Sequence, residues 1–219
     1  MSLSSSPQLI KAGLVVLDAA SGSVHRTIAL QYNPETLSRS FQVQGVGGDA
    51  GAEKAQPFRL KGPAIETIKF DAEIDATDAL EQPDQNANAV QYGVAPQLAV
   101  LEALVNRSVD EMLAINAESK SGTLEILPPE APLVLFVWGA NRVVPVRLTD
   151  LSITEEAFDA ALNPVRAKVS IGLRVMSTDD LGFDHRGGSA FINHLRSRES
   201  LAGKTGSASL ATLGLSSLP

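Results

Sequence analysis

The chain has 219 residues, of which 44% are hydrophobic and 20% charged, a composition typical of one large globular domain. Its 18 Lys and Arg residues against 25 Asp and Glu residues give a formal net charge of −7, which argues against nucleic-acid binding because that requires a basic surface. The absence of cysteine excludes disulfides, thiolate metal sites and cysteine nucleophiles.

The first third of the chain predicts β-strands. Residues 9–18 and 24–32 flank a turn of small residues, which is typical of a hairpin. In residues 37–44 and 68–75 the side chains alternate with a period of two, which indicates half-buried strands of an antiparallel sheet. In the second of these strands the apolar side chains are Ile68, Phe70, Ala72 and Ile74, and the charged ones are Lys69, Asp71, Glu73 and Asp75.

One principal helix is predicted over about residues 96–115, with a kink near Asn106 left open. Residues 45–63 and 76–95, which precede it, read as long connections. Pro96 occupies a position where the first turn of a helix tolerates proline, and apolar residues follow at helical spacing. This stripe predicts packing against the core. It consists of Leu98, Leu101, Leu104, Val105, Val109, Met112 and Leu113.

Further strands are predicted in the second half of the chain. Residues 133–138 form a continuous apolar run, which indicates a strand covered on both faces, and a turn leads into residues 142–154. Residues 165–175 alternate between apolar and charged side chains, so they predict another half-buried strand. Pro145 has no N–H to donate, which indicates an edge position or a bulge.

The predicted organisation is one domain with a C-terminal extension. Residues 1–178 predict an antiparallel β-barrel or sandwich with the packed helix, so the fold class is mainly β with one principal helix (α+β). Residues 179–199 predict a short helical extension. The composition of residues 200–219 is dominated by Ser, Gly, Ala, Thr and Leu, which predicts a flexible tail.

No catalytic or metal-binding motif is complete. Gly203-Lys204-Thr205 resembles the end of a phosphate-binding loop, but Arg198 stands where that loop needs its first glycine. The acidic residues near His185 have the spacing of neither a calcium loop nor a helical histidine pair. We therefore expect a protein that is not an enzyme, with no catalytic residues, no cofactor and no metal.

Four segments, in the same order and at similar spacing, resemble the tube-domain proteins of contractile injection systems, which are related to phage tail-tube proteins. They are a "YNP" turn after an early strand, a second long strand over residues 57–71, a "P-x-x-x-F-x-W-G" strand at residues 132–139, and a closing hairpin with a "P-x-R-A" turn. The resemblance spans roughly residues 9–176. Its structural motif residues are Tyr32, Asn33, Pro34, Phe136, Trp138, Gly139, Asn163, Pro164 and Arg166.

The resemblance implies a β-barrel of the phage tail-tube type that forms stacked hexameric rings. Many such proteins carry a LysM module after the tube domain, and no LysM signature follows Met176 here. We expect a structural subunit that forms a hexameric adaptor ring between the inner tube and the baseplate or spike hub. The alternatives are the main inner-tube protein of the same machine and, from another class, a ligand-binding or hydrolytic β-barrel monomer.

The expected partners are further copies of the chain, inner-tube proteins, the trimeric spike or hub and baseplate subunits, with no nucleic acid and no direct membrane insertion. The N-terminal residues show no secretory signal, so we expect assembly in the cytoplasm, within an intracellular or released injection particle. The expected interface residues are Phe41, Val43, Ile68 and Phe70, with Arg39, Lys69, Asp71 and Glu73 at opposite or rim positions.

Overall fold

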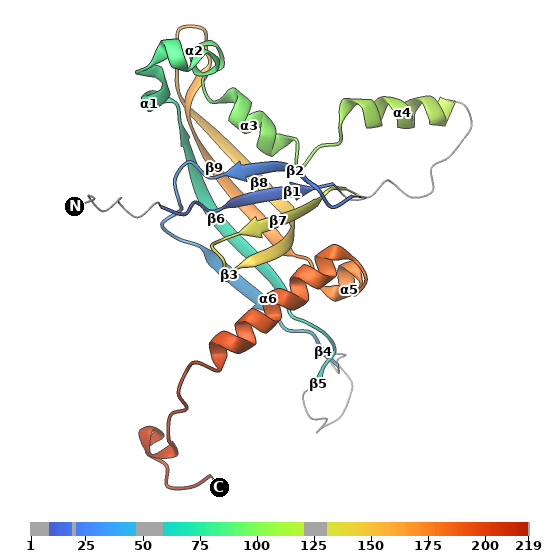
Figure 1. Ribbon diagram of the computed structural model, residues 1–219, viewed down its shortest axis with the longest axis vertical. Coiled ribbons are helices and arrows are strands. Elements are labelled where there is room, and N and C mark those ends of the chain that lie inside the picture. The colour runs from blue at the N-terminus through green and yellow to red at the C-terminus, as the bar shows by residue number, and fades with distance from the viewer. Residues whose placement is uncertain (1–8, 19–20, 47–58, 121–130, 219) are drawn as a thin grey trace, which may run out of the picture.

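The computed structural model describes residues 9–18, 21–46, 59–120 and 131–218 (Figure 1). Among these, seven strands form one antiparallel sheet in the order β2-β1-β7-β8-β9-β6-β3. Their bounds are β1 Gly13–Leu17, β2 Val24–Ala29, β3 Ser38–Gln42, β6 Ile65–Asp75, β7 Leu133–Val137, β8 Val143–Phe158 and β9 Pro164–Val175. The short strands β4 Gly45–Val46 and β5 Arg59–Leu60 pair separately. Together with the helices, this sheet confirms the predicted α+β class with antiparallel strands.

Three long strands, β8, β9 and β6, lie side by side in the sheet between β7 and β3. Strand β8 has 16 residues, and it pairs with β7 only through Val143–Val146 while it pairs with β9 along most of its length. The ladder between β8 and β9 is interrupted by a bulge between Leu148 and Asp150. Gly172 lies opposite this bulge, where an added Cβ would come within 2.9 Å of the Asp150 Cβ, so the close approach requires glycine.

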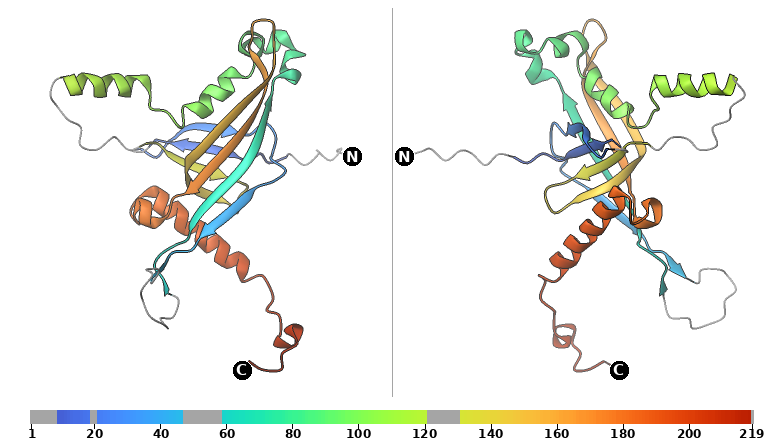
Figure 2. Two further views of the ribbon diagram at one scale, coloured as in Figure 1. Left: turned by 180° about the vertical axis from the view of Figure 1, so that it is seen from behind. Right: turned by 45° about the vertical axis from the view of Figure 1, so that its right-hand side comes forward.

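The sheet curls so that β1, β2 and β7 lie across the inner face of β6, β9 and β8 (Figures 1 and 2). The Phe70 ring on β6 stacks on the Phe136 ring of β7 at a centroid distance of 5.4 Å, and Trp138 lies against both. The side chain of Gln31 accepts from the Asp75 amide and donates to the Asp75 carbonyl, at 2.9 and 2.8 Å. These two bonds connect the chain after β2 to the end of β6.

The predicted alternation is confirmed on the two strands where it is longest. On β6, Ile68, Phe70 and Ala72 are buried. On β9, the buried positions include Val169, Ile171 and Leu173, which are paired with the β6 positions in register. Because neighbouring side chains in a strand point to opposite faces, Lys69, Asp71 and Glu73 lie on the outer face of the sheet.

Short helices occupy most of residues 76–95, which the sequence predicts to be a long connection. They are α1 Thr77–Leu80, η1 Pro83–Gln85 and α2 Ala87–Tyr92, and they gather with the tip of the β8–β9 hairpin at one end of the long strands (Figure 2). At the other end, α5 Thr178–Leu181 is followed by α6 Arg186–Ala202, whose Phe191 is buried against the core. The chain then continues through η2 Leu210–Leu213.

The helix expected over residues 96–115 is two separate helices, and the break between them includes Asn106, where the sequence leaves a kink open. Helix α3 spans Ala95–Glu102 and buries Leu98 and Leu101. Helix α4 spans Val109–Lys120 and buries none of its residues. The apolar stripe therefore serves the core only in its first half. No helix among the described residues is long and apolar enough to span a membrane.

Candidate functional site

The outer face of the three long strands carries a ladder of charged and polar side chains. Lys69, Asp71 and Glu73 are exposed on β6, and the register places Asp71 opposite Ser170 and Glu73 opposite Lys168 on β9. The Ser170 hydroxyl donates to Asp71. Exposed pairs of this kind contribute at most about 1 kcal/mol each to folding, so the ladder is chiefly a surface feature.

The ladder ends in a tighter pair. The Arg166 Nε donates to Asp75 Oδ2 at 2.8 Å, and it lies 3.7 Å from Glu73 Oε1. The hydroxyl and amide of Thr77 lower the pKa of Asp75, and Arg166 adds to this effect. In turn, the Asp75 carboxylate raises the pKa of the Arg166 guanidinium. The motif residue Arg166 thus fixes the start of β9 to the end of β6.

Several stretches of strand edge carry no ladder partner within the described residues, among them the outer edge of β2 at one end of the sheet. Strand β3 pairs with β6 on one side only, and the part of β8 beyond Val146 pairs only with β9. The exposed side chains of Phe41 and Val43 accompany the β3 edge, at 53% and 56% exposure. Such edges pair readily with a strand of another chain.

The structure separates the expected interface residues into two groups. Phe41 and Val43 are available for contact, whereas Ile68 and Phe70 are 0% and 5% exposed and belong to the core of the subunit itself. Arg39 does not share the face of Lys69, Asp71 and Glu73. It is in register with Ile68, and paired residues of neighbouring strands point to the same face, so Arg39 lies on the face of Ile68. Its guanidinium lies over the Phe41 ring, 4.8 Å from the ring centroid.

A partly buried charge cluster, which we define as Arg39, Glu66, Arg142, His194 and Arg198, lies where β3, β6, α6 and the β7–β8 turn meet, with Glu66 and His194 buried and the arginines half-buried. The Arg39 Nε donates to Glu66 Oε1 at 2.5 Å, and the Arg198 Nε donates to His194 Nε2 at 3.1 Å. Burial, together with the positive charge of neighbouring arginines, lowers the pKa values of Arg142, His194 and Arg198. Two buried nitrogens, Arg39 Nη2 and His194 Nδ1, have no hydrogen-bond partner in the described part of the chain.

Sequence reasoning missed the cluster, although one signal for it was present. Glu66 has the same parity as Ile68, Phe70 and Ala72, so a carboxylate at this position had to lie on the apolar face of its strand. A carboxylate buried there requires a cationic partner. The partner could not be identified from sequence, because Arg39 and His194 reach it from other elements.

The motif residues near the N-terminal strands hold turns together. Asn33 Oδ1 accepts from the Ala12 amide and Asn33 Nδ2 donates to the Ile10 carbonyl, both at 2.8 Å. Its side chain therefore acts as a ladder partner for the chain before β1, while Pro34 is half-buried and Tyr32 is exposed.

The other motif residues close the turns of the long strands. Asn163 donates from its amide and side chain to the Asp159 carboxylate, which lowers the pKa of Asp159, and the Pro164 carbonyl accepts from Val94. Trp138 donates to the Arg142 carbonyl across the β7–β8 turn, where Gly139 adopts a φ of +71°. These residues position strands and show no arrangement for chemistry.

No group of three or more metal-ligating side chains occurs among the described residues that could hold a metal ion. A shallow hollow of about 340 Å³ does lie on the outer face, bordered by Ser38, Lys69, Asp71, Asp150 and Ser170. The polar groups at its border are carboxylates, hydroxyls and an ammonium group from four strands, β3, β6, β8 and β9. The geometry therefore presents a polar sheet face flanked by open edges.

The chain is similar to a known protein family and to solved structures. A family model described as contractile injection system tube protein matches residues 8–183. Two solved structures are similar, titled "Tail of empty GTA particle computed with helical refinement, C6 symmetry" and "Virion of native gene transfer agent (GTA) particle". The first is 16% identical and covers 75% of this chain and 90% of its own, with a TM-score of 0.28. The second is 13% identical and covers 76% and 91%, with a TM-score of 0.27. No curated protein sequence matches the chain.

Proposed function

Because the chain belongs to the contractile injection system tube protein family, we propose that it forms a hexameric adaptor ring that joins the inner tube to the baseplate or spike hub. Its role is structural and involves no catalysis. The ring assembles in the cytoplasm with inner-tube proteins, the spike or hub trimer and baseplate subunits, as part of an intracellular or released injection particle.

The observation that carries this proposal is the pair of open edges on one sheet. Strand β3 is open on one flank of β6 and β9, and β8 beyond Val146 is open on the other flank. The open edge of β8 on one subunit meets the β3 edge of the next. Repetition of this head-to-tail contact closes a ring and covers both of these edges.

Ring closure in this manner assigns the two faces of the sheet. The face that carries Lys69, Asp71 and Glu73 lines the channel, and the apolar face remains inside each subunit. Phe41 and Val43 lie beside the β3 edge, so they pack against the neighbour when the edges join. This packing removes apolar surface from water and favours the closed ring.

The C-terminal region favours an adaptor over the main tube protein. Beyond α6, the chain carries exposed leucines that lie outside the core cluster of the described residues. They are Leu210, Leu213, Leu215 and Leu218. A repeating tube ring needs compact, identical contacts above and below, whereas an adaptor needs an additional surface for a different layer. These leucines supply such a surface.

Substitution of Phe41 tests the edge contact. Wild-type protein should form closed rings when a tube or spike partner is present, as measured by native mass spectrometry and electron microscopy. Phe41→Asp should reduce ring yield at an unchanged melting temperature. The matched control is Val90→Asp, which alters an apolar residue of similar exposure, 47%, on α2 away from β3. Rings that form equally well with Phe41→Asp contradict the edge contact.

The wild-type measurement also decides between classes. A protein that stays monomeric with every layer of the particle supplied, and that binds a small molecule saturably, would be the ligand-binding or hydrolytic monomer instead. A protein that polymerises alone into long tubes would be the main tube protein.

A further inference from the structure

The charge cluster holds more positive than negative charge. Of its three arginines, only Arg39 forms an ion pair within the described residues, and its partner is Glu66. His194 is neutral at neutral pH, because burial and the charge of Arg198 lower its pKa from 6.5. Three guanidinium cations therefore face one carboxylate, in a chain whose net charge is −7.

Two buried donors of the cluster have no acceptor. Arg39 donates from Nε to Glu66, but its Nη2 is buried and has no hydrogen-bond partner in the described part of the chain. His194 is 4% exposed, and its Nε2 accepts from Arg198, so the neutral ring carries its proton on Nδ1. This Nδ1 is also buried without a partner among the described residues. Since an unpaired buried donor is costly, both donors favour binding of an acceptor.

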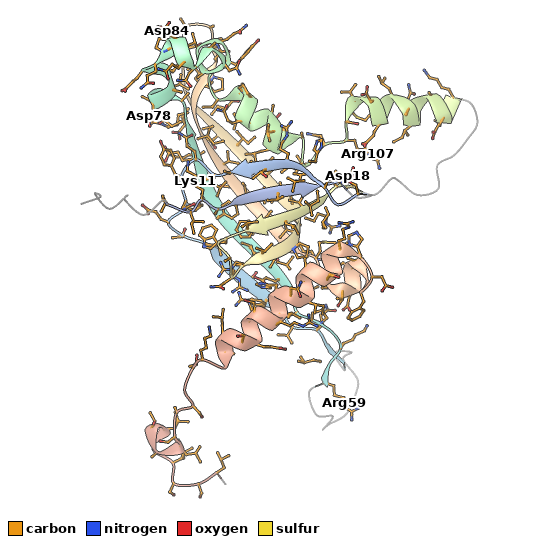
Figure 3. The ribbon with its side chains drawn as sticks, in the orientation of Figure 1. Lys11, Asp18, Arg59, Asp78, Asp84 and Arg107 are labelled. Carbon is orange, nitrogen blue, oxygen red and sulfur yellow. The ribbon has the colours of Figure 1, made fainter. Side chains whose placement is uncertain are left out.

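The position of the cluster leaves it open to a ligand from solution. Arg39 lies on β3, Arg142 in the turn between β7 and β8, and Arg198 on α6, and all three side chains are half-buried. The acidic side chains of Asp78 and Asp84 lie at the opposite end of the long strands from α6 (Figure 3). They therefore do not compensate the positive charge of the cluster.

The chemistry of the cluster selects an oxyanion. A guanidinium group is planar, and its parallel N–H groups match two oxygens of a carboxylate or a phosphate. The neighbouring cations and burial together lower the pKa values of Arg142 and Arg198, which means that the arginines repel one another in the isolated subunit. A bound anion offsets this repulsion and accepts from the free donors.

We propose that the charge cluster is a binding site for an oxyanion, either dissolved inorganic phosphate or a carboxylate from a second copy of the chain. The chemistry of recognition is the same for both sources. The second source rests on the proposed ring, in which the β3 edge beside Arg39 meets the β8 edge of the neighbour.

The open part of β8 carries a carboxylate on the required face. Glu155 is exposed and is in register with the buried Ala167, so it lies on the apolar face of the sheet. Arg39 is in register with the buried Ile68 and lies on that same face. When the two edges join, Glu155 of the neighbour and Arg39 therefore share one face of the joined sheet.

Thermal unfolding with phosphate tests the site in the full chain at low concentration. Melting temperatures are measured in rising inorganic phosphate and in sodium chloride of equal ionic strength, so that screening is matched. A ligand that binds only the folded state raises the melting temperature with its concentration. Phosphate also stabilises proteins generally by exclusion from their surface, so the decisive quantity is the difference between variants.

Two arginine variants supply that difference. Arg142→Gln should melt higher than the wild type in chloride, because a cation without a counter-charge is removed, and should lose the specific response to phosphate. Arg147→Gln removes the same charge from an exposed position on β8 and should respond like the wild type. Calorimetric titration should show saturable phosphate binding that is weakened about tenfold in Arg142→Gln. If Arg142→Gln does not fold, Arg198→Gln is measured in its place.

The responses decide the proposal. A phosphate response in the wild type and Arg147→Gln that is lost in Arg142→Gln supports an oxyanion site. An equal response in all three proteins reports only the general salt effect and overturns the proposal. A wild type that responds no more to phosphate than to chloride also overturns it.

Ring assembly in phosphate-free buffer identifies the source of the oxyanion and separates this proposal from the ring. Fewer rings with Glu155→Gln, but not with the control Glu156→Gln, whose residue is in register with Arg166 on the outer face, support a carboxylate of the second copy. Equal ring yields, with the phosphate response intact, support dissolved phosphate. Absence of rings in the wild type overturns the ring and leaves the phosphate result of the subunit standing.

Discussion

Removal of the Glu66 charge should strongly destabilise the subunit. Glu66 is 7% exposed and accepts from Arg39, and its negative charge also acts on Arg142, His194 and Arg198. In Glu66→Gln the side chain keeps its size, but the cations of the cluster lose this counter-charge. Loss of one partner of a buried ion pair costs about 3–5 kcal/mol.

The partial exposure of Arg39, 17% for its side chain, places the expected loss near the lower end, about 3 kcal/mol. For a chain of this size that corresponds to a fall in melting temperature of roughly 6–12 °C. The assay is denaturant and thermal unfolding followed by circular dichroism and by the fluorescence of Trp138, the single tryptophan.

Two further variants make the result specific. In Arg39→Met combined with Glu66→Gln, part of the lost stability should return, because Arg39 no longer leaves an unpaired charge. Glu73→Gln alters an exposed carboxylate on the same strand and should change stability by no more than about 0.5 kcal/mol. The reasoning is refuted if Glu66→Gln unfolds like the Glu73→Gln control.

Other changes probe the core, the C-terminal segment and the histidine. Phe70→Ala should lower the free energy of unfolding by about 3–5 kcal/mol, and Lys69→Ala by no more than about 0.5 kcal/mol, both measured in urea. Deletion of residues 203–219 should leave the melting temperature nearly unchanged, because the residues described there are exposed, but should reduce incorporation into particles counted by electron microscopy. Burial and the charge of Arg198 lower the pKa of His194 from 6.5. Its stabilising contribution is therefore present above pH 6.5 and is lost as pH falls toward the folded pKa. His194→Gln should flatten this decline on the acid side in a pH series of melting temperatures.

Each of these results has an opposite that would contradict it. A silent Phe70→Ala with a destabilising Lys69→Ala would mean that the two faces of β6 are exchanged. A truncated chain that unfolds would place the C-terminal segment in the core. An acid-side decline as steep in His194→Gln as in the wild type would assign the pH dependence to other groups, of which Asp75 is a candidate because its pKa is also lowered.

The strands could be predicted because their signal is local. On β6 the alternation of Ile68 and Phe70 with Lys69 and Asp71 fixes which side faces the core, and the structure keeps that assignment. The stripe from Leu98 to Leu113 was less informative. Periodicity shows that one side of a helix is apolar, but it does not show whether the surface that covers this side belongs to the same chain.

The charge cluster and the closure of the sheet depend on residues distant in sequence. Arg39 reaches Glu66 through the β3–β6 register, and His194 arrives on a helix more than a hundred residues later. Gln31 joins Asp75 through side-chain bonds to the backbone, which no composition or period indicates. Such pairings follow only once the order of the strands is known.

The separation of the two faces of β6 and β9 affects how the protein can diverge. Selection for folding acts on the buried positions and on Gly172, where even one added carbon atom meets Asp150. It acts weakly on Lys69, Glu73 and Lys168, which are exposed. The charge of the outer face can therefore drift or be redesigned at every second residue while the subunit keeps its shape. In a closed ring, each such substitution is repeated once per subunit, so a single codon changes a whole belt of charge.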